Sequence, residues 1–203
     1  MTIIVKPDKK GLKKAVEFLK KEKIIIYPTE TAYGIGGDLT NKNIIKKIYK
    51  IKKRSKNKKM SAIVSDIKMA EIYGHISEKE KIIVKKLMPG PLTLVVSKKN
   101  KFPDEANTEF VFRIPSDKFA RELTKKFEKP VIATSANISG KKPNYKIEDI
   151  LKEFKDKVDL IVDAGNLKEK PVSTIAKIEN KIKILRKGII SKKQINEVLI
   201  NAS

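Results

Sequence analysis

Two hydrophobic patterns alternate along the chain. Apolar residues three and four positions apart predict amphipathic helices, and each such stretch follows a residue type that caps helices. The predicted caps are Asp8, Asn41, Ser77, Ser116 and Ser191. Continuous runs of branched and aromatic residues, bounded by polar or turn residues, predict strands. They cover residues 24–27, 61–65, 92–97, 110–114, 130–134, 159–163, 173–178 and 182–186.

The order of these elements predicts the fold class. Strands interleaved with helices indicate an α/β or α+β domain built around a mixed sheet. The predicted strands over 159–186 follow one another without helices, which argues against a purely parallel sheet. A length of 203 residues suits a single domain over 1–203, and no internal repeat or long low-complexity linker divides it.

Composition excludes several classes of protein and site. Apolar residues make up 40% of the chain, enough to fill a core, so disorder is not expected. The chain has no Cys, and His75 is its single histidine, so we expect no disulfide, no metal site and no His-dependent triad. Lys6 and Asp8 interrupt any signal peptide, and no apolar run is long enough to span a membrane. We therefore expect a cytoplasmic protein.

The formal net charge of +23 has two interpretations. It fits a polyanionic partner such as RNA or nucleotide phosphates. It also fits a genome-wide preference for lysine, as in thermophiles. Only four basic residues are arginines, which are Arg54, Arg113, Arg121 and Arg186. Because lysine is the default cation of this chain, each arginine indicates a specific requirement.

Four segments gather groups that could bind an anion. Residues 28–37 (PTETAYGIGG) place hydroxyls and three glycines after a predicted strand, although an ordinary glycine-rich loop has the same composition. Residues 51–59 form a basic run in which Arg54 supplies a planar fork, but cations at a helix C-terminus also compensate its dipole. Residues 130–143 run from a strand into TSANISG, which suits an anion nest or a local turn.

The fourth segment lies near the C-terminus, where Ser173 and Thr174 precede a strand and Arg186 ends one. Arg113 lies within the apolar run FVFRIP, so we expect it to contact either a bound anion or a structural carboxylate. No GxxxxGK[ST] or GxGxxG pattern occurs, so a nucleotide site would be built differently from the common ones.

Taken together, these segments resemble the YrdC-like family, whose motifs occur here in the family's order over about residues 20–190. The matching segments are PTETAYGIG (28–36), Lys52-x-Arg54, MPGPLT (88–93), FRIP (112–115), TSANISG (134–140), VSTI (172–175) and ILRKG (184–188). Five positions depart from the family's pattern. Ser55 and Lys59 stand where prolines are usual, Met60 where leucine is usual, Ile63 where longer relatives have histidine, and Glu109 where Thr or Ser is frequent.

The resemblance implies a twisted mixed sheet flanked by helices, with a basic concave face, in the short single-domain type of the family. It implies an L-threonylcarbamoyladenylate synthase, a nucleotidyltransferase that uses L-threonine, bicarbonate and ATP and releases pyrophosphate. A separate transferase would use the product to make N6-threonylcarbamoyladenosine in tRNA. Mg²⁺ would accompany ATP.

The resemblance also implies roles for individual residues. Lys52 and Arg54 would be catalytic, and they would hold phosphates and bicarbonate together with Lys58 and Arg186. The residues expected to bind threonine are Thr31, Tyr33, Arg113 and Ser173, of which Arg113 would pair with the carboxylate and Tyr33 would close over the site. Those expected to bind ATP are Arg54, Lys58, Ser135, Asn137 and Arg186.

Two alternatives stay open at this point. One is an RNA-binding module of the same fold, for which the net charge argues. Aromatic residues are only 6% of the chain and do not interleave with the basic run, so binding to tRNA or double-stranded RNA is expected to be weak and electrostatic. The other alternative is a carbamoyl-adenylate enzyme with a different amine acceptor.

Overall fold

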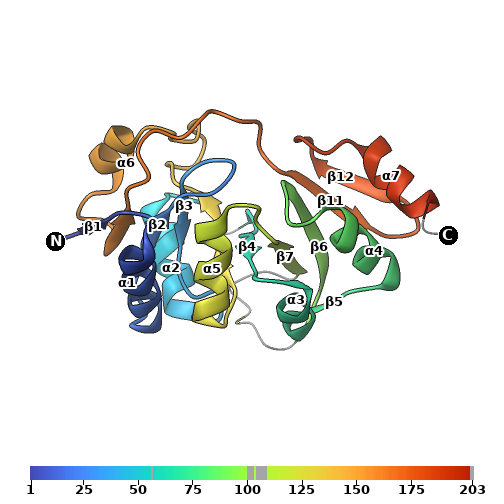
Figure 1. The fold of residues 1–203 in the computed structure, drawn as a ribbon, viewed down its shortest axis with the longest axis horizontal. Helices are drawn as coiled ribbons and strands as arrows, with labels where there is room; N and C mark the ends of the chain where they lie inside the picture. The colour runs from blue at the N-terminus through green and yellow to red at the C-terminus, as the bar shows by residue number, and fades with distance from the viewer. Residues whose placement is uncertain (56, 100–102, 104–108, 202–203) are drawn as a thin grey trace.

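The strands lie in two mixed sheets (Figure 1) in the computed structural model, which describes residues 1–55, 57–99, 103 and 109–201. The five-stranded sheet has the order β1 (Ile3–Val5), β10 (Leu160–Val162), β2 (Ile25–Tyr27), β3 (Gly34–Gly36) and β9 (Thr134–Ser135). Strands β1, β10 and β2 are parallel, whereas β3 and β9 pair antiparallel. The predicted α/β class with mixed pairing is therefore confirmed.

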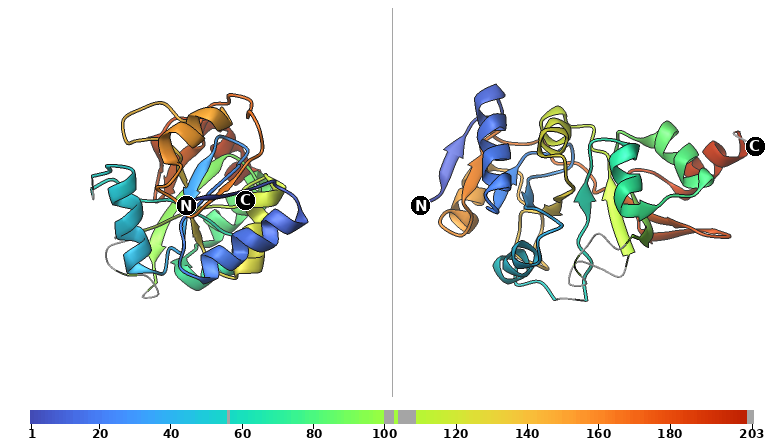
Figure 2. Two further views of the ribbon diagram at one scale, coloured as in Figure 1. Left: turned by 90° about the vertical axis from the view of Figure 1, so that its left-hand side faces the viewer. Right: turned by 90° about the horizontal axis from the view of Figure 1, so that it is seen from below.

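The seven-stranded sheet contains the central and C-terminal strands. Its order is β12 (Ile182–Arg186), β11 (Thr174–Ile178), β6 (Leu92–Lys98), β7 (Glu109–Arg113), β4 (Ala62–Ile63) and β8 (Val131–Ile132), with β5 (Gly74–His75) paired to β6. Strand β8 leads directly into β9 of the other sheet, so the two sheets meet there. Strand β1 lies at one end of the long axis, and the C-terminal strands β11 and β12 lie toward the other, as Figures 1 and 2 show.

Seven helices cover these sheets within the described residues. They are α1 (Lys9–Lys20), α2 (Lys42–Ile51), α3 (Ile67–Tyr73), α4 (Glu78–Leu87), α5 (Lys118–Phe127), α6 (Ile147–Phe154) and α7 (Lys192–Ile200). The caps predicted at Asp8, Asn41, Ser77 and Ser191 are confirmed by side-chain hydrogen bonds to the first turn. The prediction for Ser116 is wrong by one residue, because the Asp117 carboxylate accepts the Ala120 amide at 2.8 Å and α5 starts at Lys118.

Strand β2 shows why its sequence is an unbroken apolar run. Ile24 and Ile26 pack into the core cluster that contains α2, whereas Ile25 and Tyr27 pack into the cluster formed with α1 and α5. A strand covered on both faces has no solvent side and therefore no polar alternation. The end of β2 is thus fixed rigidly, and the segment that follows it begins the candidate site.

The glycine-rich segment after β2 is a strand for part of its length. A Cβ on Gly36 would lie 2.6 Å from the Tyr27 ring and 2.8 Å from the Ile132 carbonyl oxygen, so only glycine allows these segments to approach.

No helix in the described part of the chain is long and apolar enough to cross a bilayer.

Candidate functional site

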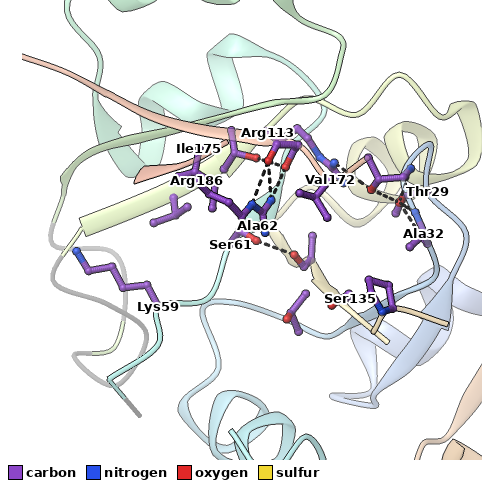
Figure 3. Close-up of a pocket in the computed structure, with 18 of the residues that line it drawn as sticks. Thr29, Ala32, Lys59, Ser61, Ala62, Arg113, Ser135, Val172, Ile175 and Arg186 are labelled. Carbon is purple, nitrogen blue, oxygen red and sulfur yellow. Dashed lines mark hydrogen bonds between the residues drawn. The ribbon is translucent and has the colours of Figure 1, made fainter. Parts of the chain in front are cut away.

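A cleft of about 330 Å³ lies where the two sheets face each other. Its walls come from the segment after β2, the loop after α2, the start of β9 and the strands β6, β7, β11 and β12 (Figure 3). Its lining combines hydroxyls (Thr29, Thr31, Ser61, Thr93, Thr134, Ser135 and Ser173), cations (Arg54, Lys59, Arg113 and Arg186) and aliphatic side chains (Val95, Val111, Val172, Ile175 and Leu185). No carboxylate is part of this lining among the described residues.

The structure brings most of the predicted site residues together. Those that line the cleft are Thr31, Tyr33, Arg54, Arg113, Ser135, Ser173 and Arg186. Lys52, Lys58 and Asn137 lie next to it but are not part of the lining. The roles that the family resemblance implies for all ten residues stay predictions, and the geometry below shows what each side chain contacts.

Arg186 and Ser173 form the most constrained corner of the cleft. Arg186 Nη2 donates to the carbonyl and to the hydroxyl oxygen of Ser173, each at 2.8 Å, and Nε donates to the same carbonyl at 3.1 Å. The Ser173 hydroxyl lies 3.0 Å from that of Thr93. Burial lowers the pKa of the Arg186 guanidinium, and repulsion from Arg113 and Arg54 lowers it further. The partners of this cation that the structure shows are neutral oxygens, so its charge is left for an anion to neutralise.

Arg113 lies between a structural carboxylate and the cleft, where an anion could bind. Its Nη1 lies 3.1 Å from Glu30 Oε1 and 3.4 Å from the Thr31 hydroxyl, and the arginine side chain is only 9% exposed. Both carboxylate oxygens of Glu30 are buried without a hydrogen-bond partner. Arg113 is therefore paired on one side with a structural carboxylate and faces the cleft on the other, and Glu30 is a residue to which sequence reasoning gave no separate role.

The turn that follows β2 is held by its own hydroxyls. Thr29 Oγ1 donates to the Ala32 carbonyl at 2.6 Å, and it lies 3.1 Å from the Thr31 hydroxyl. The buried Tyr33 hydroxyl donates to the Gly165 carbonyl at 2.7 Å and accepts from the Ala164 amide at 3.0 Å. Tyr33 thus anchors the segment that follows β10 and leads to β11 in the other sheet. Closure of its ring over the site stays a prediction.

Lys52 is turned inward beneath the TSAN segment. It is 1% exposed, and its ammonium donates to the carbonyl oxygens of Ser135 and of Asn137, the latter at 2.7 Å. Asn137 in turn donates to the carbonyls of Ile138 and Lys141 at 2.9 and 2.7 Å. Lys52 and Asn137 therefore hold the loop whose Ser135 lines the cleft, rather than lining it themselves.

Burial, followed by repulsion from Arg54, lowers the pKa of Lys52 from 10.5 to about 7. Between these values the unfolded chain binds one more proton, so this residue makes the free energy of unfolding rise with pH from about 7 to 10.5. We expect Lys52→Met to lack this rise, which urea denaturation across that range would measure. An identical pH dependence in both proteins would contradict a depressed pKa at Lys52.

Arg54 directs its fork at its own loop. Nε donates to the Lys58 carbonyl at 3.1 Å and Nη2 to the Lys59 carbonyl at 2.7 Å, and burial lowers the pKa of the guanidinium. The Lys58 carbonyl also accepts the Tyr49 hydroxyl at 3.0 Å. Lys56 of the basic run lies outside the described residues. Lys59, which sequence analysis noted only as a departure from the family pattern, lines the cleft.

Comparison with known proteins agrees with these features. Residues 17–188 match the Sua5/YciO/YrdC family model, which is described as telomere recombination. A Methanocaldococcus jannaschii protein, provisionally named threonylcarbamoyl-AMP synthase, is 41% identical over 184 residues, covering 88% of this chain and 87% of that protein. The Bacillus subtilis threonylcarbamoyl-AMP synthase is 33% identical over 194 residues, covering 91% of this chain. The chain spans 55% of that longer relative.

A solved structure is similar in fold over nearly the whole chain. The crystal structure of Pyrococcus abyssi Sua5 complexed with L-threonine superposes with a TM-score of 0.90 at 28% identity, covering 98% of this chain and 60% of that one. Family match, sequence identity and fold all extend over nearly the whole chain, and most of the predicted site residues line one cleft. The chain therefore belongs to the Sua5/YciO/YrdC family.

Proposed function

We propose that the protein is a nucleotidyltransferase that makes L-threonylcarbamoyladenylate and pyrophosphate from L-threonine, bicarbonate and ATP. The product would be used by a separate transferase to modify adenosine in tRNA. The observation that carries this proposal is a cleft lined by three arginines, one lysine and seven serine and threonine side chains, with no carboxylate in the lining that the structure describes. Such a lining suits several anionic groups bound at once.

The threonine end of the cleft would lie at Arg113. A guanidinium binds a carboxylate through two parallel hydrogen bonds, and Arg113 faces the cleft beside the hydroxyls of Thr31 and Ser173. Hydroxyls can accept from an amine and donate to a carboxylate. The L-threonine complex of the similar Pyrococcus abyssi Sua5 supports this class of substrate.

The polyphosphate would lie against Arg54 and Arg186, because the partners that the structure shows for these two arginines are neutral oxygens. Lys58, at the end of the same loop as Arg54, would add a positive charge. Ser135 would contact ATP directly, and Asn137 would act by holding the loop that carries Ser135. Lys52 would fix that loop from below through the carbonyl oxygens of Ser135 and Asn137.

The chemistry requires two bond-forming steps. The neutral amine of threonine attacks the carbon of bicarbonate, water leaves, and a carbamate forms. A carbamate oxygen then attacks the α-phosphorus of ATP, the bond to the β-phosphate oxygen breaks, and pyrophosphate carries away the electron pair. Neither step needs a protein nucleophile, so positioning and neutralisation of charge are what the residues supply.

Mg²⁺ would enter the site on ATP as part of the substrate. No group of three or more His, Asp or Glu side chains in the described part of the chain could hold a metal ion by itself. Phosphate oxygens are the ligands that Mg²⁺ commonly takes from a nucleotide, with few protein carboxylates. The arginines of the cleft would then neutralise the part of the phosphate charge that Mg²⁺ does not.

The direct test measures pyrophosphate release from ATP with each substrate omitted in turn. We expect release that requires both bicarbonate and L-threonine, with radiolabelled bicarbonate incorporated into an adenylate. Glycine, serine and valine replace threonine in parallel reactions and test other acceptors. Equal release without any amino acid would leave an unspecific ATPase, and faster release with another amine would instead support an enzyme with a different acceptor.

A further inference from the structure

Lys59 lines the cleft, but its ammonium pairs with a carboxylate that is not part of the lining. Its side chain lines the cleft, yet in Figure 3 its ammonium extends away from Ser61, Arg113 and Arg186. The direction has a simple cause, because the ammonium donates to the carboxylate of Glu109 at the start of β7. Lys59 and Glu109 are 50 positions apart in the sequence, so this pair ties the loop after α2 to the seven-stranded sheet.

Glu109 is shared between two lysines. Its second oxygen lies 2.9 Å from the ammonium of Lys177 in β11, which also contacts Glu179 at 2.7 Å. Burial works to raise the pKa of the Glu109 carboxyl, but hydrogen bonds from Lys59 and Lys177 outweigh it and lower the pKa. The carboxylate is thus charged at neutral pH, and it neutralises Lys59 at the edge of a cleft that otherwise carries three arginines.

The pair is weak enough to be exchanged. Lys59 is 45% exposed and Glu109 is 20% exposed, and ion pairs with exposed members contribute little because water screens them. A lysine side chain is a flexible stem with a compact charge, so it can change partners without a change in the backbone. A polyphosphate in the cleft offers more negative charge than one carboxylate.

We propose that Lys59 is a further polyphosphate ligand of the cleft and that Glu109 competes with the polyphosphate for its ammonium. This inference rests on the proposed nucleotide site and deepens it. Glu109 then limits the affinity of the cleft for polyphosphate, and it does so through Lys59 alone. Among the described residues, the partners of Arg54 and Arg186 are neutral oxygens, so neither arginine has such a competitor there.

Calorimetric titration with inorganic tripolyphosphate at low ionic strength tests this directly. Glu109→Gln keeps the shape and removes the competing charge, so we expect the Kd to fall about two- to fivefold, the size expected for breaking one exposed pair. Lys59→Met should raise the Kd by a similar factor. In the double variant the gain from Glu109→Gln should disappear, and its Kd should equal that of Lys59→Met.

Glu179→Gln is the matched control, because it removes the same charge from the same network without touching Lys59. We expect its Kd to stay within about 1.5-fold of wild type, since screening weakens charges that do not contact the ligand or its lysine. Equal tightening by both glutamine variants, or tightening that persists with Lys59→Met, would show a general field effect and overturn the proposal. Weaker binding by Glu109→Gln would show that Glu109 positions Lys59, which also overturns it.

The same experiment is independent of the synthase reaction. Absence of any tripolyphosphate binding by the wild-type protein would overturn the inference about Lys59. Whether pyrophosphate release requires threonine and bicarbonate would still decide the proposed function by itself. Failure of the inference about Lys59 and failure of the proposed function are therefore distinguishable.

Discussion

Replacing Arg113 by methionine is expected to lower the free energy of unfolding by about 3–5 kcal/mol and to abolish threonine-dependent turnover. The large effect on stability follows from burial, since the side chains of Arg113 and Glu30 are only 9% and 12% exposed. Without Arg113, the Glu30 carboxylate loses the cation with which it pairs in the described part of the chain, and both of its oxygens lack hydrogen bonds. Urea denaturation and pyrophosphate release measure the two effects separately.

Removing the whole pair separates stability from function. A buried ion pair replaced as a unit by neutral groups is often close to neutral in stability, whereas removal of one partner is not. We therefore expect Glu30→Gln/Arg113→Met to recover most of the lost stability and none of the activity. A double variant as unstable as Arg113→Met would contradict the pairing. Turnover near wild type in either variant would contradict a role for Arg113 in binding threonine.

The local parts of the fold are predictable from the sequence because their causes are local. Caps such as Asp8 and Ser77 act on the next turn of their own helix, and the strand at β2 follows from an apolar run. Where two capping residues stand side by side, as at Ser116 and Asp117, pattern alone does not choose between them. In the structure the cap is Asp117, because its carboxylate accepts a hydrogen bond from the Ala120 amide.

The division into two sheets was not predictable in the same way. Strand β3 is Gly-Ile-Gly, so it has only one branched residue, and glycine is depleted in strands. It forms because the Tyr27 ring lies against Gly36 and because both β2 and β9 pair with it. Strands β8 and β9 are two residues each, and they are defined only by the neighbours they join.

The candidate site shows the same limit at the level of side chains. Seven of the ten residues predicted for the site line one cleft, and their roles stay predictions. The charge pattern of 51–59 gives no reason to bury Lys52 while the adjacent Lys53 stays exposed. That choice depends on the carbonyl oxygens of Ser135 and Asn137, which lie 83 and 85 positions away. The partner of Lys59 is likewise distant in the sequence, so its contact with Glu109 becomes visible only in the fold.

The second large effect is expected at Arg54, whose replacement by lysine should reduce kcat/KM about ten- to a hundredfold. Lysine keeps the charge but lacks the rigid planar pair of donors that binds an anion bidentately, and a hydrogen bond to a charged group contributes about 1.5–3 kcal/mol. Lys53→Ala is the control, because Lys53 is the exposed neighbour and its side chain is not part of the cleft lining. Arg54 also donates to the carbonyls of Lys58 and Lys59, so Arg54→Lys should loosen this loop and lower Tm slightly, whereas Lys53→Ala should not. Turnover and Tm measured for both variants distinguish a bidentate ligand from a diffuse basic patch. Equal losses of activity in the two variants would show a diffuse patch. Wild-type turnover by Arg54→Lys would show that the Arg54 guanidinium acts only on its own loop.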